Sequence, residues 1–401
     1  MTVHGAKNAV LPMLAASVLT PAPVTVRDCP HITDVEDMLG VLRALGVEVT
    51  VTDREITVTG SPACTDIPPG LAGGMRSSVF MLGALLSRCG EVELASPGGC
   101  RIGARPLDIH FDGLERMGVR VECGDGRILC TADRLHGADI VLRYPSVGAT
   151  ENLVMAAVCA EGVTRIIGAA REPEIVSLVR LLRKMGADIA GEGSPVVTVR
   201  GVDELDGASA TPSPDRIVAG TVMAAVAVCG GRVELSGADS SDMGAVISPF
   251  LGAHTFLIEH GGAITFESDG MLSPTDVCTG PYPLFPTDMQ APFMACQCFA
   301  AGMSSMRETV FEDRFAHVAE LRRMGARIAV AGNTAFVDGS GGMRGSVIAA
   351  SDLRGGAGLA VAALGAEGES ILSGTVYIDR GYEDMARMFS SLGGKISRRR
   401  V

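Results

Sequence analysis

The stretch Met117-Gly118-Val119-Arg120-Val121 ends an apolar periodic segment and begins an alternating one. The same pattern recurs along the chain at intervals of roughly 70 residues, which is typical of a structural repeat. The glycines of this series are Gly46, Gly118, Gly186, Gly252, Gly325 and Gly393. A glycine just past the last apolar helical position is the usual left-handed end of a helix, and the alternation after it predicts a strand. The series therefore predicts six copies of one supersecondary unit.

A second series of helices lies between these glycines and is rich in Ala, Met and Cys. Its members end at Ala22, Gly90, Gly162, Gly230, Gly302 and Gly368. Segments 155–160 and 360–364 are nearly all small and apolar, which is typical of a helix buried on all sides. The helices of the first series are amphipathic, as in residues 32–45, where Thr33 and Glu36 form a predicted capping box. One unit is therefore a strand, a buried helix, a strand, an amphipathic helix and a strand pair.

Six such units predict an α/β protein of two domains, each with three units around its own inner helices. The Pro- and Ser-rich stretch Thr211-Pro-Ser-Pro-Asp215 follows the third unit and is the expected hinge. We expect an N-terminal domain over residues 1–212, which carries a cysteine-containing loop, and a C-terminal domain over residues 213–401. Pro249 falls inside the expected amphipathic helix of the fourth unit and should kink or shorten it.

Composition limits the partners of the chain. Of its 401 residues, 46 are acidic and 34 are basic, and the net charge of -12 disfavours nucleic acid and anionic membranes as partners. No apolar run reaches the roughly 20 residues that a membrane helix needs. The 11 cysteines form no C-x-x-C pair and no cluster with zinc spacing, so we expect no metal site and mostly buried thiols in a reducing cytoplasm.

A glycine-rich loop at residues 96–110 combines a cysteine with an arginine just before an amphipathic helix. Gly98, Gly99 and Gly103 permit close approach of the backbone to a ligand, and Arg105 offers a planar fork for phosphate or carboxylate. The loop is consistent with an anion site beside the thiol of Cys100. An ordinary surface loop with a stray cysteine is the alternative, because such a loop without a fixed spacing signature is a weak signal.

The repeat also places charged residues where helices begin. The equivalent positions of the buried helices are Asn8 (beside Lys7), Arg76, Gly148, Arg216, Asp288 and Arg354, and two amphipathic helices have Arg105 and Arg380 near their starts. Helix N-termini attract anions, so several such ends with cations fit a ligand with several phosphate or carboxylate groups. Alternatively, these arginines form structural salt bridges between units and contact no ligand.

Asp288 differs from its equivalents because it brings a carboxylate to a helix start. Neighbouring cations would favour its charged form, yet it could accept a proton from a bound hydroxyl within hydrogen-bond reach. An N-cap aspartate is the structural alternative.

The stretches Gly5-Ala-Lys-Asn-Ala9 and Phe285-Pro-Thr-Asp-Met-Gln290, with residues 97–110, 146–150, 170–174, 309–312 and 378–382, resemble the UDP-N-acetylglucosamine 1-carboxyvinyltransferase family. The resemblance covers nearly the whole chain. It implies the enolpyruvyl transferase fold, a two-domain inside-out α/β barrel of six βαβαββ units. It also implies transfer of the enolpyruvyl group from phosphoenolpyruvate to the 3'-hydroxyl of UDP-N-acetylglucosamine in peptidoglycan synthesis.

The resemblance also implies roles for individual residues. Cys100 would protonate the methylene carbon of phosphoenolpyruvate and would be alkylated by fosfomycin, and Asp288 would accept the hydroxyl proton. Lys7, Arg105 and Arg380 would bind phosphoenolpyruvate, with Lys7 and Arg380 counted with Cys100 and Asp288 as catalytic. The residues expected at the nucleotide sugar are Asn8, Arg76, Arg105, Pro106, Leu107, Asp108, Ile109, Tyr144, Pro145, Ser146, Val147, Asp288 and Val310, and Arg354 is added to the substrate-binding set because of its helix start. No metal or organic cofactor is implied, and we expect a monomer or a weak homo-oligomer.

Two departures from the family pattern affect these expectations. The family usually has two more strands before the equivalent of Gly5, so we expect a fragment or a misassigned start with an exposed sheet edge. Tyr144 stands where some members carry a basic residue against the nucleotide. The alternative functions are a non-catalytic paralogue that binds UDP-sugar, the sister transferase acting on 3-phosphoshikimate, and an RNA-end-processing enzyme of similar repeats, which the acidic charge disfavours.

Overall fold

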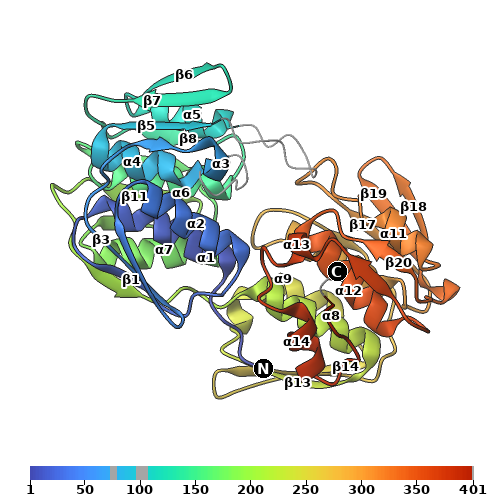
Figure 1. The fold of residues 1–401 in the computed structure, drawn as a ribbon. Helices are drawn as coiled ribbons and strands as arrows, with labels where there is room; N and C mark the ends of the chain where they lie inside the picture. The colour runs from blue at the N-terminus through green and yellow to red at the C-terminus, as the bar shows by residue number, and fades with distance from the viewer. Residues whose placement is uncertain (73–78, 96–106, 400–401) are drawn as a thin grey trace. The chain divides into compact units, whose positions relative to one another are not determined.

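The computed structural model describes residues 1–72, 79–95 and 107–399, drawn as coloured ribbon in Figure 1. These residues form two compact units. The C-terminal unit contains Met1–His4 and the described chain from Pro214 onward, and the N-terminal unit contains the described residues from Gly5 to Ser213. Within the described ranges, no helix is long and apolar enough to span a bilayer.

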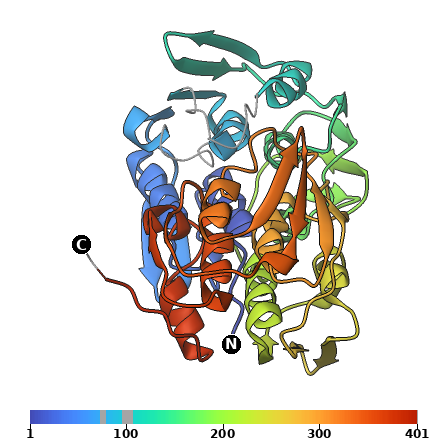
Figure 2. The ribbon, with the colours of Figure 1, turned by 90° about the vertical axis from the view of Figure 1, so that its right-hand side faces the viewer.

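The N-terminal unit contains three repeats, each with its own sheet. Its helices are α1 (Lys7–Ala16), α2 (Thr33–Ala44), α3 (Pro69–Ala72), α4 (Met81–Cys89), α5 (Asp108–Arg116), α6 (Val147–Ala157) and α7 (Pro173–Lys184). Its strands are β1 (Val24–Val26), β2 (Glu48–Thr52), β3 (Glu55–Thr59), β4 (Asp66–Ile67), β5 (Glu91–Ala95), β6 (Arg120–Gly124), β7 (Arg127–Thr131), β8 (Asp139–Val141), β9 (Val163–Ile167), β10 (Asp188–Ala190), β11 (Val196–Arg200) and β12 (Ala208–Ala210). The sheet orders are β12-β1-β3-β2, β4-β5-β7-β6 and β10-β11-β9-β8. Figure 2 shows the β6–β7 hairpin in teal at the top.

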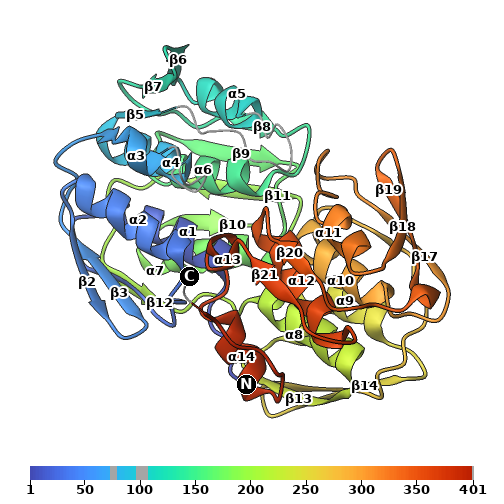
Figure 3. The same cartoon turned by 45° about the vertical axis from the view of Figure 1, so that its right-hand side comes forward.

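The first sheet contains a strand from the far end of the N-terminal unit. The first repeat has no strand of its own before α1, and β12, which follows the third repeat, pairs in parallel with β1 through Val24–Ala208 and Val26–Ala210. Figure 3 shows β12, β3 and β2 beside α7 and α2. Each of the three repeats in this unit therefore has a four-stranded sheet.

The C-terminal unit repeats the same plan. Its helices are α8 (Arg216–Cys229), α9 (Gly244–Ile247), α10 (Gln290–Gln297), α11 (Val318–Arg323), α12 (Leu353–Gly365), α13 (Thr375–Ile378) and α14 (Met385–Ser391). Its strands are β13 (Gly231–Ser236), β14 (Thr255–His260), β15 (Ala263–Ser268), β16 (Val277–Cys278), β17 (Met303–Arg307), β18 (Arg327–Ala331), β19 (Thr334–Asp338), β20 (Val347–Ala349) and β21 (Ile371–Ser373). They form sheets of order β13-β15-β14, β16-β17-β19-β18 and β20-β21.

Helices of small residues form the centre of each unit. In the C-terminal unit α8, α10 and α12 pack against one another, and in the N-terminal unit α4 packs against both α1 and α6. Small side chains let these helices approach closely. At Gly83 of α4 an added Cβ would lie 2.1 Å from the backbone oxygen of Asn152 in α6, so only glycine fits this crossing.

The predicted repeat is confirmed by the ends of its helices. Five of the six amphipathic-helix glycines have left-handed backbone angles, from φ 88° at Gly46 to φ 106° at Gly186, and Gly252 is the exception. In that fourth repeat the helix is shortened as expected, because α9 ends at Ile247 and a 3-10 turn, η4 (Ser248–Phe250), contains Pro249.

Two expectations from the sequence are wrong. The capping box at Thr33 does not form, because α2 begins at Thr33 itself and Ile32 occupies the N-cap position. Most cysteines are not buried: of the ten in the described part of the chain, four are buried, one is intermediate and five are exposed. Two of the exposed ones, Cys89 and Cys229, are the last residues of α4 and α8, where a helix emerges from the core.

Candidate active site

The predicted base, Asp288, lies in the C-terminal unit in a 3-10 turn, η5 (Thr287–Met289), that leads directly into α10. Its Oδ1 accepts a hydrogen bond from Nη2 of Arg314 at 2.8 Å. Its Oδ2 accepts from Nε of Arg354 at 3.1 Å and lies 3.0 Å from Nη2 of the same residue. Asp288 does not cap α10, whose N-cap residue is Met289 with no side-chain bond. The structure therefore brings two predicted site residues, Asp288 and Arg354, into one ion pair.

Arg354 is held at the first turn of α12. Asp352 caps this helix and accepts hydrogen bonds from the backbone N–H groups of Arg354 and Gly355 at 3.1 and 2.9 Å. The Arg354 side chain is 4% exposed. Burial lowers the pKa of Arg354, but the carboxylates of Asp288 and Asp215 and the contact with Tyr382 outweigh burial and raise this pKa above its usual value. Arg354 is thus a permanent buried cation.

Arg314 is the second cation on Asp288, and no sequence pattern indicated it. It lies in the segment between β17 and α11, its side chain is 4% exposed, and its guanidinium sits 5.4 Å from the ring centroid of Phe311. His317 follows on the same segment, and burial lowers the pKa of its imidazole to about 4. The carboxylate of Asp288 therefore lies between two buried guanidinium groups, and a neutral histidine lies near the second of them.

Val310, a predicted nucleotide contact, lies on a loop fixed by a buried glutamate. Glu308 is 2% exposed, and its Oε1 accepts from the backbone N–H of Val310 at 2.8 Å and from Thr279 Oγ1 at 2.8 Å. Its Oε2 accepts from the hydroxyl of Thr287, the neighbour of Asp288, at 2.9 Å. Glu308 thus connects the Val310 loop to the turn that carries Asp288, although no sequence pattern indicated this glutamate.

Arg380, another predicted phosphoenolpyruvate ligand, follows α13 and lies two residues before Tyr382. Arg380 is half-buried. This short segment therefore carries both Arg380 and the tyrosine that contacts Arg354.

In the N-terminal unit, Lys7 and Asn8 begin α1 as the repeat predicts. Lys7 forms an ion pair with Asp34 in the first turn of α2, and their side chains are only 12% and 3% exposed. A buried carboxylate thus holds the ammonium group of Lys7 at the helix start. The sequence suggested the position of Lys7 but not this partner.

The predicted residues Leu107, Asp108 and Ile109 lie at the start of α5, where Leu107 is the N-cap residue. Oδ1 of Asp108 accepts from the backbone N–H of Ile109 at 2.8 Å, and its Oδ2 pairs with Arg143. Arg143 also donates to Asp112 at 3.2 Å. It therefore connects the first turn of α5 to the end of β8.

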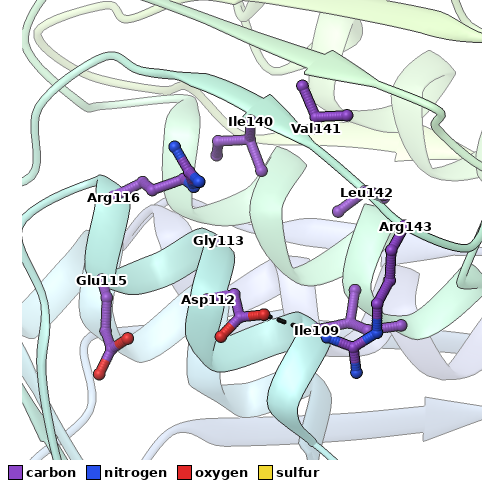
Figure 4. A pocket seen from close by; sticks show the side chains of 9 residues that line it. All are labelled: Ile109, Asp112, Gly113, Glu115, Arg116, Ile140, Val141, Leu142 and Arg143. Carbon is purple, nitrogen blue, oxygen red and sulfur yellow. Dashed lines mark hydrogen bonds and ion pairs between the residues drawn. The ribbon is translucent and has the colours of Figure 1, made fainter.

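Beside this ion pair lies an open crevice of about 410 Å³, lined by α5 and by residues 140–143 (Figure 4). Apolar Ile109 and Leu142 lie among charged side chains of both signs, including Asp112 and Arg116. Tyr144, Pro145, Ser146 and Val147 continue from Arg143 into α6, and Ser146 caps this helix by accepting from the backbone N–H of Ala149 at 3.3 Å.

Four predicted site residues, Cys100, Arg76, Arg105 and Pro106, lie outside the described residues. Within the described ranges, the predicted residues gather at three places: the start of α1, the neighbouring starts of α5 and α6, and the surroundings of Asp288. Each unit carries part of the predicted set.

The repeated βαβαββ units match the fold of the enolpyruvyl transferases, as comparison with solved structures shows. The crystal structure of the enolpyruvyl transferase NikO from Streptomyces tendae matches with a TM-score of 0.89 and 25% identity, and the match covers 99% of this chain and 95% of that one. The EPSP synthase structure from Acinetobacter baumannii matches with a TM-score of 0.75 at 18% identity, over 99% of this chain and 96% of the other, and this likeness supports the fold alone.

Sequence comparison gives the family. A family model described as EPSP synthase (3-phosphoshikimate 1-carboxyvinyltransferase) matches residues 1–389, and the chain belongs to this family. A relative from Carboxydothermus hydrogenoformans, named UDP-N-acetylglucosamine 1-carboxyvinyltransferase 2, is 44% identical over 99% of this chain and 95% of its own length. A relative from Magnetococcus marinus, named UDP-N-acetylglucosamine 1-carboxyvinyltransferase, is also 44% identical over the same shares.

Proposed function

We propose that the chain transfers the enolpyruvyl group of phosphoenolpyruvate to the 3'-hydroxyl of UDP-N-acetylglucosamine and releases phosphate, in the first committed step of peptidoglycan synthesis. The observation that carries the proposal is the 44% identity, over 99% of the chain, to a relative named for this transfer. The NikO likeness supports the reaction class, because that protein is described as an enolpyruvyl transferase.

Asp288 is the proposed acceptor of the hydroxyl proton. A quarter of its side chain, 25%, is exposed, so a substrate hydroxyl can reach the carboxylate even though both oxygens accept from arginines. The two guanidinium groups fix the plane of the carboxylate and keep it charged, which aims its lone pairs before substrate arrives. The cations lower the basicity of the carboxylate, and the fixed position of the base compensates for that loss in the proposed reaction.

The remaining predicted residues have proposed roles in binding and protonation. Lys7, Arg105 and Arg380 bind the phosphate and carboxylate of phosphoenolpyruvate, because ammonium and guanidinium groups pair with such anions through charge-assisted hydrogen bonds. The sets at the starts of α5 and α6, with Asn8, Arg76 and Val310, hold the nucleotide sugar. Cys100 protonates the methylene carbon as the sugar oxygen bonds to the adjacent carbon. Phosphate then leaves that adjacent carbon and the new methyl group loses a proton, which restores the double bond of the enolpyruvyl group. The proposal assigns no metal or organic cofactor.

The sister reaction, transfer to 3-phosphoshikimate, is a second candidate because the matching family model carries that description. The two differ only in acceptor, so one experiment separates them. Phosphoenolpyruvate is incubated with the protein and either UDP-N-acetylglucosamine or 3-phosphoshikimate, and products are identified by mass spectrometry, with Cys100→Ala as control. We expect enolpyruvyl-UDP-N-acetylglucosamine from the parent alone.

Product from 3-phosphoshikimate alone would assign the sister activity. Absence of product with either acceptor would favour a non-catalytic paralogue that binds UDP-sugar. Labelling with fosfomycin gives a separate readout, since an intact site should be alkylated at Cys100 and a lapsed one should not react selectively.

We also propose that the protein works in the cytoplasm, where both substrates are made, as a monomer or a weak homo-oligomer. Sedimentation at several protein concentrations, with and without UDP-N-acetylglucosamine, tests the second point.

A further inference from the structure

The guanidinium of Arg354 is shared between a carboxylate and a phenol. Its Nε and Nη2 face Oδ2 of Asp288 at 3.1 and 3.0 Å, while Nη1 donates to the hydroxyl of Tyr382 at 3.4 Å. The guanidinium also lies 5.7 Å from the centroid of the Tyr382 ring. Any rotation of Arg354 that breaks its contact with Tyr382 therefore also changes its geometry on Asp288.

The hydroxyl of Tyr382 has a fixed direction. Thr221 in α8 donates its single hydroxyl proton to the backbone oxygen of Ile217 at 2.7 Å. Its oxygen lies 2.8 Å from the Tyr382 hydroxyl, so in that contact Thr221 accepts and Tyr382 donates. The lone pairs of Tyr382 are then left to accept from Arg354. The proton order runs from Arg354 through Tyr382 and Thr221 to Ile217, and no second arrangement satisfies all of these contacts.

Burial makes this chain of hydrogen bonds rigid. Arg354 is 3% exposed, Tyr382 is 2% exposed and Thr221 is fully buried. Arg354 lies in α12, Tyr382 in the segment before α14 and Thr221 in α8, so this series of hydrogen bonds joins three parts of the C-terminal unit. Burial raises the pKa of Tyr382, which keeps its hydroxyl protonated. Water cannot easily replace a lost partner at such a site.

We propose that Tyr382 is a positioning residue that, backed by Thr221, holds Arg354 in register on Asp288. The inference rests on the proposed function, in which Asp288 receives the hydroxyl proton. Asp288 is faced by Arg314 as well as Arg354, and Arg354 is faced also by the charge of Asp215 at the start of α8. Removal of the Tyr382 hydroxyl leaves Nη1 unpaired in the core and lets Arg354 shift toward Asp215 and away from Asp288.

The test uses Tyr382→Phe, which keeps the ring beside the guanidinium and deletes only the hydroxyl. Tyr377→Phe, five residues earlier on α13, is the matched control, and Thr221→Val removes the group that orients Tyr382. We expect kcat to fall about tenfold in Tyr382→Phe and less in Thr221→Val. The acidic limb of kcat against pH should move to higher pH, because a retreating cation lets the carboxylate take up a proton more easily.

If Tyr382 had only a structural role, Tyr382→Phe would lower the melting temperature and the fraction of active protein but would leave the dependence of kcat on pH unchanged. The proposal would therefore be overturned if the Tyr382→Phe protein folded and had the same kcat, and the same acidic limb of kcat against pH, as the parent. The titration of the Asp288 side-chain carbon in ¹³C-aspartate protein, assigned with Asp288→Asn, gives a readout that needs no turnover. Its midpoint should rise in Tyr382→Phe and not in Tyr377→Phe, and equal midpoints would refute the positioning role even if the parent proved inactive on both acceptors.

Discussion

Replacement of Asp288 by asparagine should destabilise the C-terminal unit, whatever its effect on catalysis. The change keeps the shape of the side chain but removes the charge that faces Arg314 and Arg354, whose side chains are each 4% exposed. Loss of one partner from a buried ion pair typically costs about 3–5 kcal/mol, because the remaining charge has no compensation. Asp288 is itself 25% exposed, so water can partly replace it. We therefore expect a loss of about 3 kcal/mol.

Urea unfolding followed by far-UV circular dichroism is the suitable assay, because the chain has no tryptophan for fluorescence. A loss of this size should lower the midpoint of the affected transition by about 1 M urea. Hydrogen exchange should place the loss in α10 and α12, the helices that begin at the ion pair. The matched control is Asp379→Asn, which breaks the 2.6 Å pair with Arg398 in the same unit.

The two carboxylates are about equally exposed, at 24% for Asp379 and 25% for Asp288, but Arg398 is 44% exposed where Arg314 and Arg354 are 4% exposed. Water can solvate Arg398 after the substitution, so loss of the control pair should hardly move the midpoint. The double variant Asp288→Asn with Arg354→Met should recover part of the loss, because one of the two stranded cations is then gone. Equal midpoints for Asp288→Asn and Asp379→Asn would show that the buried guanidinium groups do not depend on Asp288, and would refute the reasoning.

Three further predictions concern stability. Gly83→Ala should destabilise the N-terminal unit, because the new Cβ would lie 2.1 Å from the backbone oxygen of Asn152. Gly124→Ala is the control, since its new Cβ has open space around it, and thermal melts of the two variants should show a lower melting temperature for Gly83→Ala alone. Burial, with Glu174 and Glu172 nearby, raises the pKa of Glu151, so folding disfavours its ionised form and the parent loses stability as pH rises above about 4.5. Urea midpoints at pH 5 and 8 should show that Glu151→Gln gains on the parent as pH rises. Burial lowers the pKa of His317 to about 4, so its contribution is present above pH 6.5 and lost as pH falls toward 4. His317→Gln should therefore flatten this acid loss, measured by urea midpoints across that range.

The repeat architecture could be predicted because its signals are local. A left-handed glycine such as Gly118, with φ 96°, ends a helix through contacts within one turn, and the alternating residues after it form a strand whatever their partner. A strand before the fourth buried helix is part of the predicted unit, but its pairing with β1 in the first sheet could not be predicted, because that pairing depends on closure of the N-terminal unit and not on the local sequence of β12. Burial of cysteines was misjudged because composition says nothing of position along a helix, as Cys89 at the end of α4 illustrates.

The candidate site shows the same division between local and distant information. The repeat placed Asp288 and Arg354 at equivalent helix starts, but they are 66 residues apart, and nothing local indicates that the arginine points at the carboxylate. Arg314 and Glu308 were missed because neither stands at a helix start of the repeat; their value comes from partners such as Asp288 and Thr287. The sequence was therefore sufficient to place these residues at helix starts, whereas their hydrogen-bond partners could be identified only in the folded structure.

The charge of the Asp288 cluster limits how it could work in the proposed reaction. Asp288, Arg314 and Arg354 together carry a net charge of +1 in a mostly buried place, and the charge of Asp215 also faces Arg354. If Asp288 accepted a proton there, both guanidinium groups would lose the carboxylate that they share, and this is costly at low effective dielectric. An anionic substrate beside the cluster offsets that cost. Phosphoenolpyruvate and the diphosphate of the nucleotide sugar are both anions, so we expect proton acceptance by Asp288 to cost less when the proposed substrates are bound than in the empty protein.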